Sequence, residues 1–417
     1  MRVLIVTDAF PPRCGGSGWS TFHLAESLAR AGHEARVLQP VAGRSGIGVR
    51  RYEGVDVTEF GYVLHDVPYL RSVLRDEVLA RRLAAHLVRE LRERPADVVH
   101  AQHALSASPA IAAGREAGVP VVVTVRDYWP TCYFTTASVD GAHCPQCGFR
   151  GMLRCMREKS PRAYWAGIPL MPYMRRNVRR KQERLRQAAA VIAVSRYVAD
   201  VVVRPIVGGA ATHVIPNSIG ADEVRRAAAE PPTSALPERF LLFAGKLNAL
   251  KGADFALDVL SRIRHSIPLV MVGEGPRRRA IERRALEQHL NVQVLPWVDN
   301  REVWRIMRRA TLVLVPSLWS EPLSRTVTEA MAAGAPVAAT DRGGIHDQIE
   351  HRKSGLVLPV DAGKFAEEVD ALLGDPPARE RYIVAARRRA EDVFDDHAVL
   401  PRLEELYLSV SATVRPS

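Results

Sequence analysis

The stretch Ser320-Glu321-Pro322-Leu323-Ser324-Arg325-Thr326-Val327-Thr328-Glu329, followed by Ala330-Met331-Ala332-Ala333-Gly334, sets the fold prediction for the chain. It comes after an apolar run, residues 311–316, that is typical of a strand buried in a parallel sheet. Ser320 is suited to cap a helix, Pro322 to occupy its first turn and Gly334 to end it. The sequence therefore predicts a strand, a tight turn and a helix.

The backbone of such a turn can bind an anion. We expect unpaired N–H groups at Leu323 and Ser324, close to the positive end of the helix dipole. Glu321 and Glu329 flank this position, and their carboxylates can accept hydrogen bonds from hydroxyl groups on either side of a bound diphosphate. The stretch thus indicates a site for a nucleotide-sugar.

The length of the chain, 417 residues, fits two domains of about 200 residues each. Hydrophobic residues make up 47% and charged residues 25%, as in ordinary globular proteins. No run approaches the roughly 18 apolar residues of a membrane span. The N-terminal residues are typical of a first strand rather than a signal peptide. We therefore expect a cytoplasmic protein.

The formal net charge of +12 suits nucleic acid, an anionic membrane or phosphorylated substrates as partners. No nucleic-acid-binding module is present and aromatic residues are not interleaved with the basic ones, so no nucleic-acid partner is expected. Residues 165–173 are largely apolar and the helix predicted after them is rich in arginine, which suits peripheral contact with an anionic membrane. A solvated helix at the domain edge is the alternative.

In the first half, a strand at 2–7 is followed by the glycine-rich loop Gly15-Gly16-x-Gly18 and a helix predicted from Ser20 to Ala31. Glycines allow the backbone to approach a ligand, although the spacing is not the dinucleotide-binding one and an ordinary loop is equally consistent. Strands at 97–100 and 119–125 lead to His103 and Arg126. Ligands of open α/β sheets bind at such carboxyl ends.

In the second half, Lys246 and Lys251 lie in the loop after a strand at 240–244. They are two of only six lysines in an arginine-rich chain, which favours an anion-binding role over a solvated surface. The strand at 268–272 ends at Gly273, in another turn at a carboxyl end. The apolar segment 292–298 ends at Val298 and has an edge strand as its plain interpretation.

Four of the five cysteines, Cys132, Cys144, Cys147 and Cys155, lie within 24 residues. The C-x2-C pair is typical of zinc sites, although the overall spacing matches no standard zinc finger. A structural zinc ion and inert or redox-active thiols both remain open. A cytosolic setting disfavours disulfides.

The pair Glu321/Glu329 forms an E-x7-E pattern. Together with the lysine pair and the glycine loop in this order, it resembles the retaining glycosyltransferases of family 4, which have the GT-B fold. The resemblance implies an α/β fold of two Rossmann-like βαβ domains facing a cleft. The expected parts are an acceptor-side domain over 1–212 with a cysteine-containing insert at about 130–160, a nucleotide-sugar domain over 213–393, and a helix over 394–417 that crosses back.

The resemblance also implies roles for single residues. Catalytic positions are expected at Glu321, Lys246, Lys251, Arg126 and His103. The residues that would contact the donor are Gly15, Gly16, Gly18, Lys246, Lys251, Gly273, Val298, Glu321, Leu323, Ser324 and Glu329, and Val298 lies in the region that surrounds the base in the family. The family often has histidine where this chain has Arg126. Arginine cannot act as a base, but it would grip a phosphate or carboxylate on the acceptor.

The expected activity is transfer from a nucleotide-diphospho-sugar to a glycan, glycolipid or small-molecule acceptor, in cell-envelope polysaccharide, glycolipid or glycoside biosynthesis. The chain has no D-x-D pair, so no catalytic metal is expected and the lysines would take its place. The enzyme would lie in the cytoplasm, at the inner face of the membrane. The alternatives are a GT-B nucleotide-sugar epimerase and a non-catalytic GT-B scaffold that binds a nucleotide-sugar.

Overall fold

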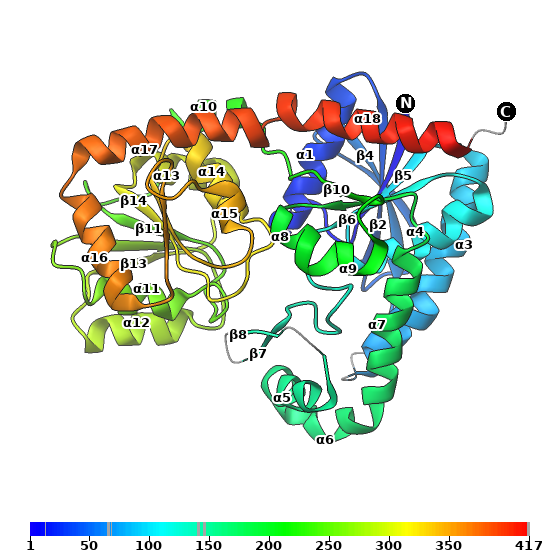
Figure 1. Ribbon diagram of the computed structural model, residues 1–417, viewed down its shortest axis with the longest axis horizontal. Coiled ribbons are helices and arrows are strands. Elements are labelled where there is room, and N and C mark those ends of the chain that lie inside the picture. The colour runs from blue at the N-terminus through cyan, green and yellow to red at the C-terminus, as the bar shows by residue number, and fades with distance from the viewer. Residues whose placement is uncertain (13, 65–66, 68, 140–141, 145–146, 415–417) are drawn as a thin grey trace. The chain divides into compact units, whose positions relative to one another are not determined.

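The computed structural model describes residues 1–12, 14–64, 67, 69–139, 142–144 and 147–414. The chain divides into two compact units. The first comprises residues 1–140, 144–218 and 399–417, and the second comprises residues 141–143 and 219–398. Each unit is a sheet of mainly parallel strands covered by helices (Figure 1). The predicted α/β class with two Rossmann-like halves is confirmed.

Among the described residues, the first unit contains an eight-stranded sheet in the order β10-β9-β6-β5-β1-β2-β4-β3. Its strands are β1 (Arg2–Val6), β2 (Glu34–Ala42), β3 (Gly46–Tyr52), β4 (Val55–Tyr62), β5 (Val98–Ala101), β6 (Val121–Val125), β9 (Ala190–Ala193) and β10 (Thr212–Val214). Only the edge pair β3–β4 is antiparallel. The helical segments are α1 (Gly16–Arg30), α2 (Leu70–Leu74), η1 (Arg75–Leu79), α3 (Ala80–Glu93), α4 (Ala104–Ala117), α5 (Phe149–Lys159), η2 (Pro161–Ala163), α6 (Tyr164–Gly167), η3 (Ile168–Leu170), α7 (Met171–Leu185), α8 (Arg196–Val198), η4 (Ala199–Val203), α9 (Arg204–Val207) and α18 (Asp396–Val414). Two further short strands are β7 (Ser138–Val139) and β8 (Ala142–His143).

In the described part of the second unit, six strands form an all-parallel sheet in the order β13-β12-β11-β14-β15-β16. They are β11 (Leu241–Ala244), β12 (Leu269–Val272), β13 (Val292–Leu295), β14 (Leu312–Val315), β15 (Val337–Thr340) and β16 (Leu356–Leu358). The helical segments are α10 (Ala221–Ala228), α11 (Ala253–Leu260), α12 (Arg278–Glu287), α13 (Asn300–Arg309), α14 (Arg325–Ala333), α15 (Ile345–Gln348), α16 (Ala362–Leu373), α17 (Pro376–Arg389) and η5 (Ala390–Phe394).

The apolar runs form strands because both faces of each sheet are covered. In β11, Leu242 belongs to one buried cluster of the second unit, while Leu241 and Phe243 belong to the cluster on the opposite face. Successive side chains of a strand point to opposite faces, so a strand buried on both sides needs an unbroken apolar run. Because these strands run parallel, their carboxyl ends all lie at one edge of the sheet.

The last helix, α18, completes the core of the first unit. Val399, Leu403 and Tyr407 pack in the same buried cluster as Val3 of β1. The Tyr407 hydroxyl lies 2.5 Å from His100 Nδ1, and Thr124 Oγ1 lies 2.7 Å from His100 Nε2. Burial lowers the pKa of His100 to about 3, so the ring is neutral and exchanges hydrogen bonds with both hydroxyls.

Helices α5, α6 and α7, the α5–α7 lobe, extend from the first unit (Figure 1). The lobe shares a small core of its own with neighbouring segments. The buried members of that core are Tyr69, Tyr133, Met152, Met156, Met171, Met174 and Val178. Cys155 on α5 is buried next to this core.

Helix α1 begins at Gly16, four residues before the predicted start at Ser20. Gly15 provides the N-cap with an extended backbone, and its carbonyl accepts the Gly18 N–H at 3.0 Å. Gly16 and Gly18 therefore belong to the first helical turn and not to a loop, which corrects the prediction. In the described chain, no helix is long and apolar enough to cross a membrane.

We predict that Tyr407→Phe lowers the free energy of unfolding by about 1–3 kcal/mol, because His100 loses a hydrogen-bond partner in a dry core. Urea denaturation compared with the wild type measures the effect. Tyr382→Phe is a suitable control, because Tyr382 is only partly buried at the edge of a second-unit cluster. Equal stabilities of Tyr407→Phe and the wild type would contradict the prediction.

Candidate functional site

The second unit has a topological switch point between β11 and β14. From this pair the strand order runs outward through β12 on one side and β15 on the other. Loops diverge at such a point and leave a crevice at the carboxyl ends, which is where open α/β sheets bind ligands. Gly245, Lys246 and Lys251 follow β11, and Ser317 and Glu321 follow β14.

Glu321 is the most constrained polar residue of this crevice. It is only 3% exposed. Its Oε1 accepts a hydrogen bond from Lys251 Nζ at 2.7 Å and another from the Ser317 hydroxyl. The Lys251 ammonium also lies 5.3 Å from the centre of the Trp319 ring. A buried carboxylate needs such partners, because desolvation without them is costly.

The backbone of Glu321 is held by the loop after β15. Glu321 forms an isolated parallel bridge with Gly343, and its carbonyl accepts the Gly344 N–H at 2.6 Å. Gly343 has a positive φ of 66°, and a Cβ atom there would lie 2.3 Å from the Glu321 carbonyl oxygen. This position therefore requires glycine.

The turn before α14 differs from the prediction. The helix begins at Arg325 with Ser324 as its N-cap, so Ser320 does not cap it. Ser324 N–H donates to Gln348 Oε1 at 2.8 Å, and Gln348 Nε2 donates to the Ser324 carbonyl at 2.7 Å. The prediction that Ser324 N–H is unpaired is wrong because a side chain from α15 takes it. Among the described residues, the Leu323 N–H donates a hydrogen bond to no acceptor.

Glu329 is buried one turn into α14. Its Oε1 accepts a hydrogen bond from Arg325 Nε at 2.6 Å, as an i,i+4 pair. The guanidinium fixes the carboxylate at the start of the helix and leaves its second oxygen available to a ligand, because a carboxylate can accept several hydrogen bonds.

The structure brings only part of the predicted donor set together. Lys251, Glu321 and Ser324 line one small cavity with Gly245, Ser317 and Thr326. Lys246 is exposed and is not among the residues that line it. Gly273 has a positive φ and packs so closely on the Gly245 carbonyl that a Cβ would lie 2.1 Å from it, so its role is close packing. Val298 is half-buried against the core and does not line the cavity.

The first unit has its own switch point, between β1 and β5. Gly15, Gly16 and Gly18 follow β1, and His103 follows β5. A Cβ on Gly18 would lie 2.6 Å from Cys14 Sγ, whereas one on Gly15 would meet nothing within 4 Å. Gly18 is therefore required by packing, and Gly15 leaves open space at the start of α1.

Arg126 forms hydrogen bonds to both α1 and the residue that follows β5. Its Nη1 donates to the Ser17 carbonyl at 3.1 Å, and its Nη2 donates to Gln102 Oε1. The guanidinium thus bridges the first turn of α1 to the end of β5. In this structure Arg126 acts as a positioning residue for the glycine segment, residues 15–18, at the start of α1.

His103 is the N-cap of α4 and is buried. Its Nδ1 accepts the Asp8 N–H at 3.3 Å, and the Thr7 hydroxyl lies 3.1 Å from the same atom. Burial, and secondly the charge of Arg126, hold the pKa of His103 well below its usual range, so the ring is neutral.

Two carboxyls lie at the same edge. Burial raises the pKa of Asp8 to about 6, although Leu105 N–H and Ser106 N–H both donate to it at 2.9 Å. Burial also raises the pKa of Asp127 to about 6, and the nearby charge of Asp8 adds to the effect. Asp8 and Asp127 were not predicted as site residues.

The four clustered cysteines carry free thiols. Cys132 and Cys144 lie within electrostatic reach of Cys147, and Cys132 and Cys147 lie within reach of Cys155. In the part of the chain that the structure describes, no three of these sulfur atoms lie within 4.8 Å of one another. In the described residues, the four thiols therefore do not have the spacing of a closed metal site.

The sequence analysis missed several residues that hold the site. Arg325 could have been found, because its i,i+4 spacing to Glu329 on a helix favours an ion pair. Ser317, Gln348 and Gln102 carry no local signal. Their roles depend on which loops and helices the sheet brings side by side.

Comparison with known proteins shows which family this chain belongs to. A model described as Glycosyltransferase Family 4 matches residues 14–223, about half of the chain, and one described as Glycosyl transferases group 1 matches residues 224–389. Two Rossmann-like units, together with these two family matches, define a glycosyltransferase of the GT-B class. The chain belongs to Glycosyltransferase Family 4. A glycogen synthase from Mycobacterium tuberculosis (strain CDC 1551 / Oshkosh) is 27% identical over 98% of this chain and 95% of its own length.

Solved structures agree on the fold. A sucrose-phosphate synthase from Thermosynechococcus elongatus aligns with a TM-score of 0.73 at 18% identity, over 99% of this chain and 100% of that one. Anabaena Alr3699/HepE in complex with UDP aligns with a TM-score of 0.68 at 18% identity, over 98% of this chain and 100% of that one. These likenesses confirm the GT-B fold predicted from the sequence.

We predict that Gly343→Ala destabilises the second unit by at least about 1 kcal/mol, because alanine is strained at positive φ and its Cβ meets the Glu321 backbone. Chemical denaturation measures this change. Gly374→Ala is the control, since its backbone is helical and a Cβ there has ordinary contacts at 3.6 Å or more. Similar losses in both variants would refute the specific role of Gly343.

Proposed function

We propose that this glycosyltransferase moves a sugar from a nucleotide-diphospho-sugar to an acceptor with retention of anomeric configuration and without a catalytic metal ion. The observation that carries the proposal is the buried Glu321 paired with Lys251 at the switch point of the second unit. The donor would bind to the domain of residues 213–393 and the acceptor to that of residues 1–212. The complex of HepE with UDP supports a nucleotide donor.

Donor binding would redistribute the charges of the crevice. The Lys251 ammonium, now on Glu321, would turn to the diphosphate, with exposed Lys246 as a second cation. The Leu323 N–H at the start of α14 would add a hydrogen bond. Glu329, oriented by Arg325, would accept hydrogen bonds from ribose hydroxyls. Gly15 leaves space at the start of α1 for a close approach by donor or acceptor.

The chemical step would then need no side-chain base. The bond between the anomeric carbon and the diphosphate oxygen breaks, and the electron pair leaves with the phosphate. Lys246 and Lys251 stabilise that developing charge, an effect typically worth about 3 kcal/mol for one contact. The acceptor oxygen forms its bond on the same face, and its proton passes to the departing phosphate oxygen. Glu321 would hold the sugar hydroxyls and stabilise the positive charge of the ring.

The acceptor would be a glycan or a lipid-linked or small glycoside. Glycogen synthase, a relative along nearly the whole chain, makes a glycan product the leading candidate. Arg126 would position the glycine segment by its bonds to Ser17 and Gln102, and neutral His103 would face the acceptor. We also infer that the enzyme works in the cytoplasm in peripheral contact with an anionic membrane.

A screen of nucleotide-sugars tests the proposal. We expect one donor class among UDP-, GDP-, ADP- and dTDP-sugars to stabilise the protein in thermal shift, with or without EDTA. Lys251→Ala should weaken that binding by about 10- to 100-fold, because a charge-assisted contact to the phosphates is lost. Lys353→Ala, which removes an exposed lysine of the same unit, should leave the affinity unchanged.

The product distinguishes the rival activities. A labelled sugar should pass from donor to acceptor with its anomeric configuration retained, and Glu321→Gln should abolish transfer while donor still binds. Conversion of the donor without any acceptor would identify an epimerase. Donor binding with neither reaction would identify a scaffold. A product of inverted configuration would overturn the proposed mechanism.

We further propose that Cys132, Cys144, Cys147 and Cys155 bind one structural zinc ion. Thiolates in a C-x2-C pair are preferred zinc ligands. The four residues lie within 24 residues of sequence, and Cys155 is buried next to the small core of the α5–α7 lobe. When bound, zinc would stabilise the fold of this region and take no part in sugar transfer.

We expect purified protein to contain about one zinc ion per chain by elemental analysis. Cys155→Ser should lose that zinc and unfold at a lower temperature, whereas Cys14→Ser, outside the cluster, should keep it. Zinc-free wild type with four titratable thiols in the native state would show that these cysteines are not ligands.

A further inference from the structure

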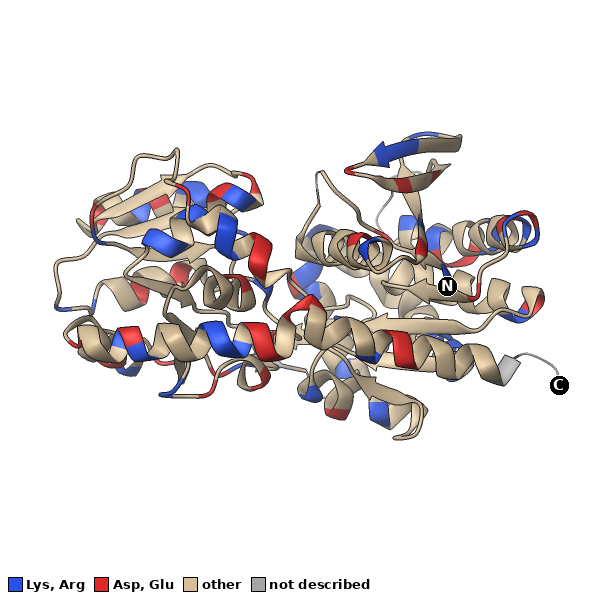
Figure 2. Ribbon diagram, turned by 90° about the horizontal axis from the view of Figure 1, so that it is seen from above, with Lys and Arg blue, Asp and Glu red and all other residues tan. Residues whose placement is uncertain are grey.

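Most of the net positive charge of the chain lies in one segment of the first unit. Residues 149–187 contain twelve Lys and Arg against two Glu, a formal charge of +10 out of +12 for the whole chain. Elsewhere the two signs are interspersed, as along α17 and η5 (Figure 2). The segment forms the α5–α7 lobe. A charge excess so localised indicates a partner for this lobe.

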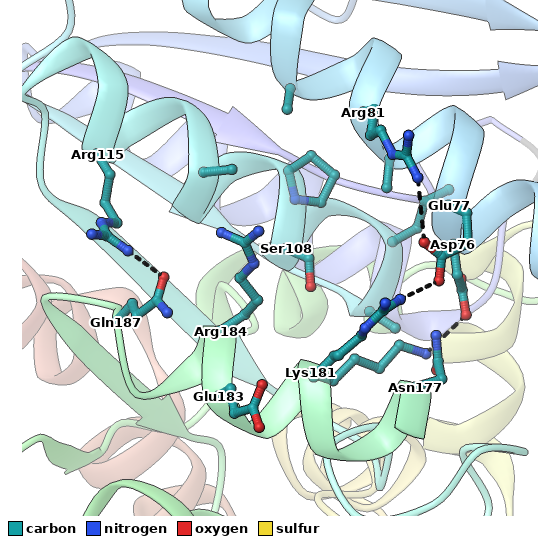
Figure 3. A pocket seen from close by; sticks show the side chains of 17 residues that line it. Asp76, Glu77, Arg81, Ser108, Arg115, Asn177, Lys181, Glu183, Arg184 and Gln187 are labelled. Carbon is teal, nitrogen blue, oxygen red and sulfur yellow. Dashed lines mark hydrogen bonds and ion pairs between the residues drawn. The ribbon is translucent and has the colours of Figure 1, made fainter. Parts of the chain in front are cut away.

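The inner face of α7 is fixed to the body of the first unit (Figure 3). Arg180 Nη1 lies 2.6 Å from Glu77 Oε1, and Lys181 Nζ lies 3.3 Å from Asp76 Oδ2. Lys181 is only 8% exposed. Arg180 and Lys181 are therefore paired with carboxylates of η1, and these two ion pairs hold α7 against the first unit.

The outer face of α7 carries cations that are not neutralised in this way. Arg175, Arg176 and Arg179 are exposed. They line a shallow hollow together with Pro172, Arg180 and one acidic residue, Glu183. Within the described ranges, no carboxylate lies at ion-pair distance from any of the three. Three neighbouring guanidinium groups that form no ion pair with a described residue, and that outnumber the one carboxylate of the hollow, provide a surface for phosphate groups.

Two large aromatic side chains of the same lobe are exposed. Trp165 on α6 is 80% exposed, and Phe149 at the start of α5 is 58% exposed. Helix α6 leads through η3 directly into the N-terminal end of α7, so Trp165 lies at the end of the lobe from which the arginines follow. Indole rings favour the interface between water and lipid headgroups, where the ring is partly dehydrated and its N–H stays hydrated.

We propose that the outer face of the α5–α7 lobe docks on an anionic phospholipid surface, with Trp165 in the headgroup layer and Arg175, Arg176 and Arg179 on the lipid phosphates. Exposed aromatic rings, combined with a face on which basic residues outnumber acidic ones, are what an interfacial helix requires. Docking deepens the membrane contact proposed above, and it does not require the donor site. Since the lobe has no membrane-spanning helix in its described residues, the attachment is peripheral and salt-sensitive.

Vesicle co-sedimentation of the full chain tests this surface. We expect binding to phosphatidylcholine vesicles that contain phosphatidylglycerol and little binding to phosphatidylcholine alone. The triple variant Arg175→Ala, Arg176→Ala, Arg179→Ala should weaken binding by at least about tenfold, because each basic residue at an anionic surface contributes roughly a factor of five. Trp165→Ala should weaken it as well and should remove the blue shift of tryptophan emission on vesicle addition.

A charge-matched control removes three arginines from the other unit. Arg279→Ala, Arg283→Ala, Arg388→Ala takes away the same formal charge from exposed positions of α12 and α17 and should bind vesicles as the wild type does. All variants should keep wild-type thermal stability and the same nucleotide-sugar response, which separates failure of docking from failure of the donor site.

Two results would overturn the proposal. Equal loss of vesicle binding in the two triple variants would show that net charge alone, and no particular surface, drives adsorption. Binding of soluble dextran sulfate through the same three arginines, with no vesicle-induced change in Trp165 emission, would instead assign the face to a soluble polyanion.

Discussion

The carboxylate of Glu321, buried at the end of β14, is the constraint on which the second unit's site depends. A charge in that position is tolerated only with fixed partners, and each partner comes from a different loop. Lys251 lies in the loop after β11, Ser317 lies in the loop after β14, and Gly343 holds the backbone from the loop after β15. One ion pair therefore coordinates three connections of the sheet, and the crevice is shaped before any ligand arrives.

The sheet itself could be predicted from the sequence. Runs such as 240–244, 268–272 and 311–316 are apolar and short, and each overlaps a parallel strand of the structure. Because parallel strands direct their carboxyl ends to one edge, residues after different strands could be grouped without any contact being known. That is why Lys251 and Glu321, 70 residues apart, were expected in one site and do lie side by side.

Helix starts and hydrogen-bond partners could not be predicted in the same way. Ser320 has the right chemistry for a cap, but α14 begins at Arg325 with Ser324 as its N-cap, and the Ser324 backbone exchanges two hydrogen bonds with the Gln348 side chain. Arg126 was interpreted as an acceptor contact, and nothing in the sequence indicated that it also donates hydrogen bonds to the Ser17 carbonyl and the Gln102 side chain. In each case a residue from a distant segment competes with local preference, and local preference alone carries no information about it.

The hydrogen bond between His100 and Tyr407 joins positions 307 residues apart, within a single unit. The core of that unit takes in Val399, Leu403 and Leu406 beside the first strand of the chain. During synthesis, the first 218 residues must therefore emerge without the helix that covers one face of their sheet. All core residues of the second unit are synthesised before the α18 residues that complete the first unit. On the ribosome, the first unit is therefore the last to be completed.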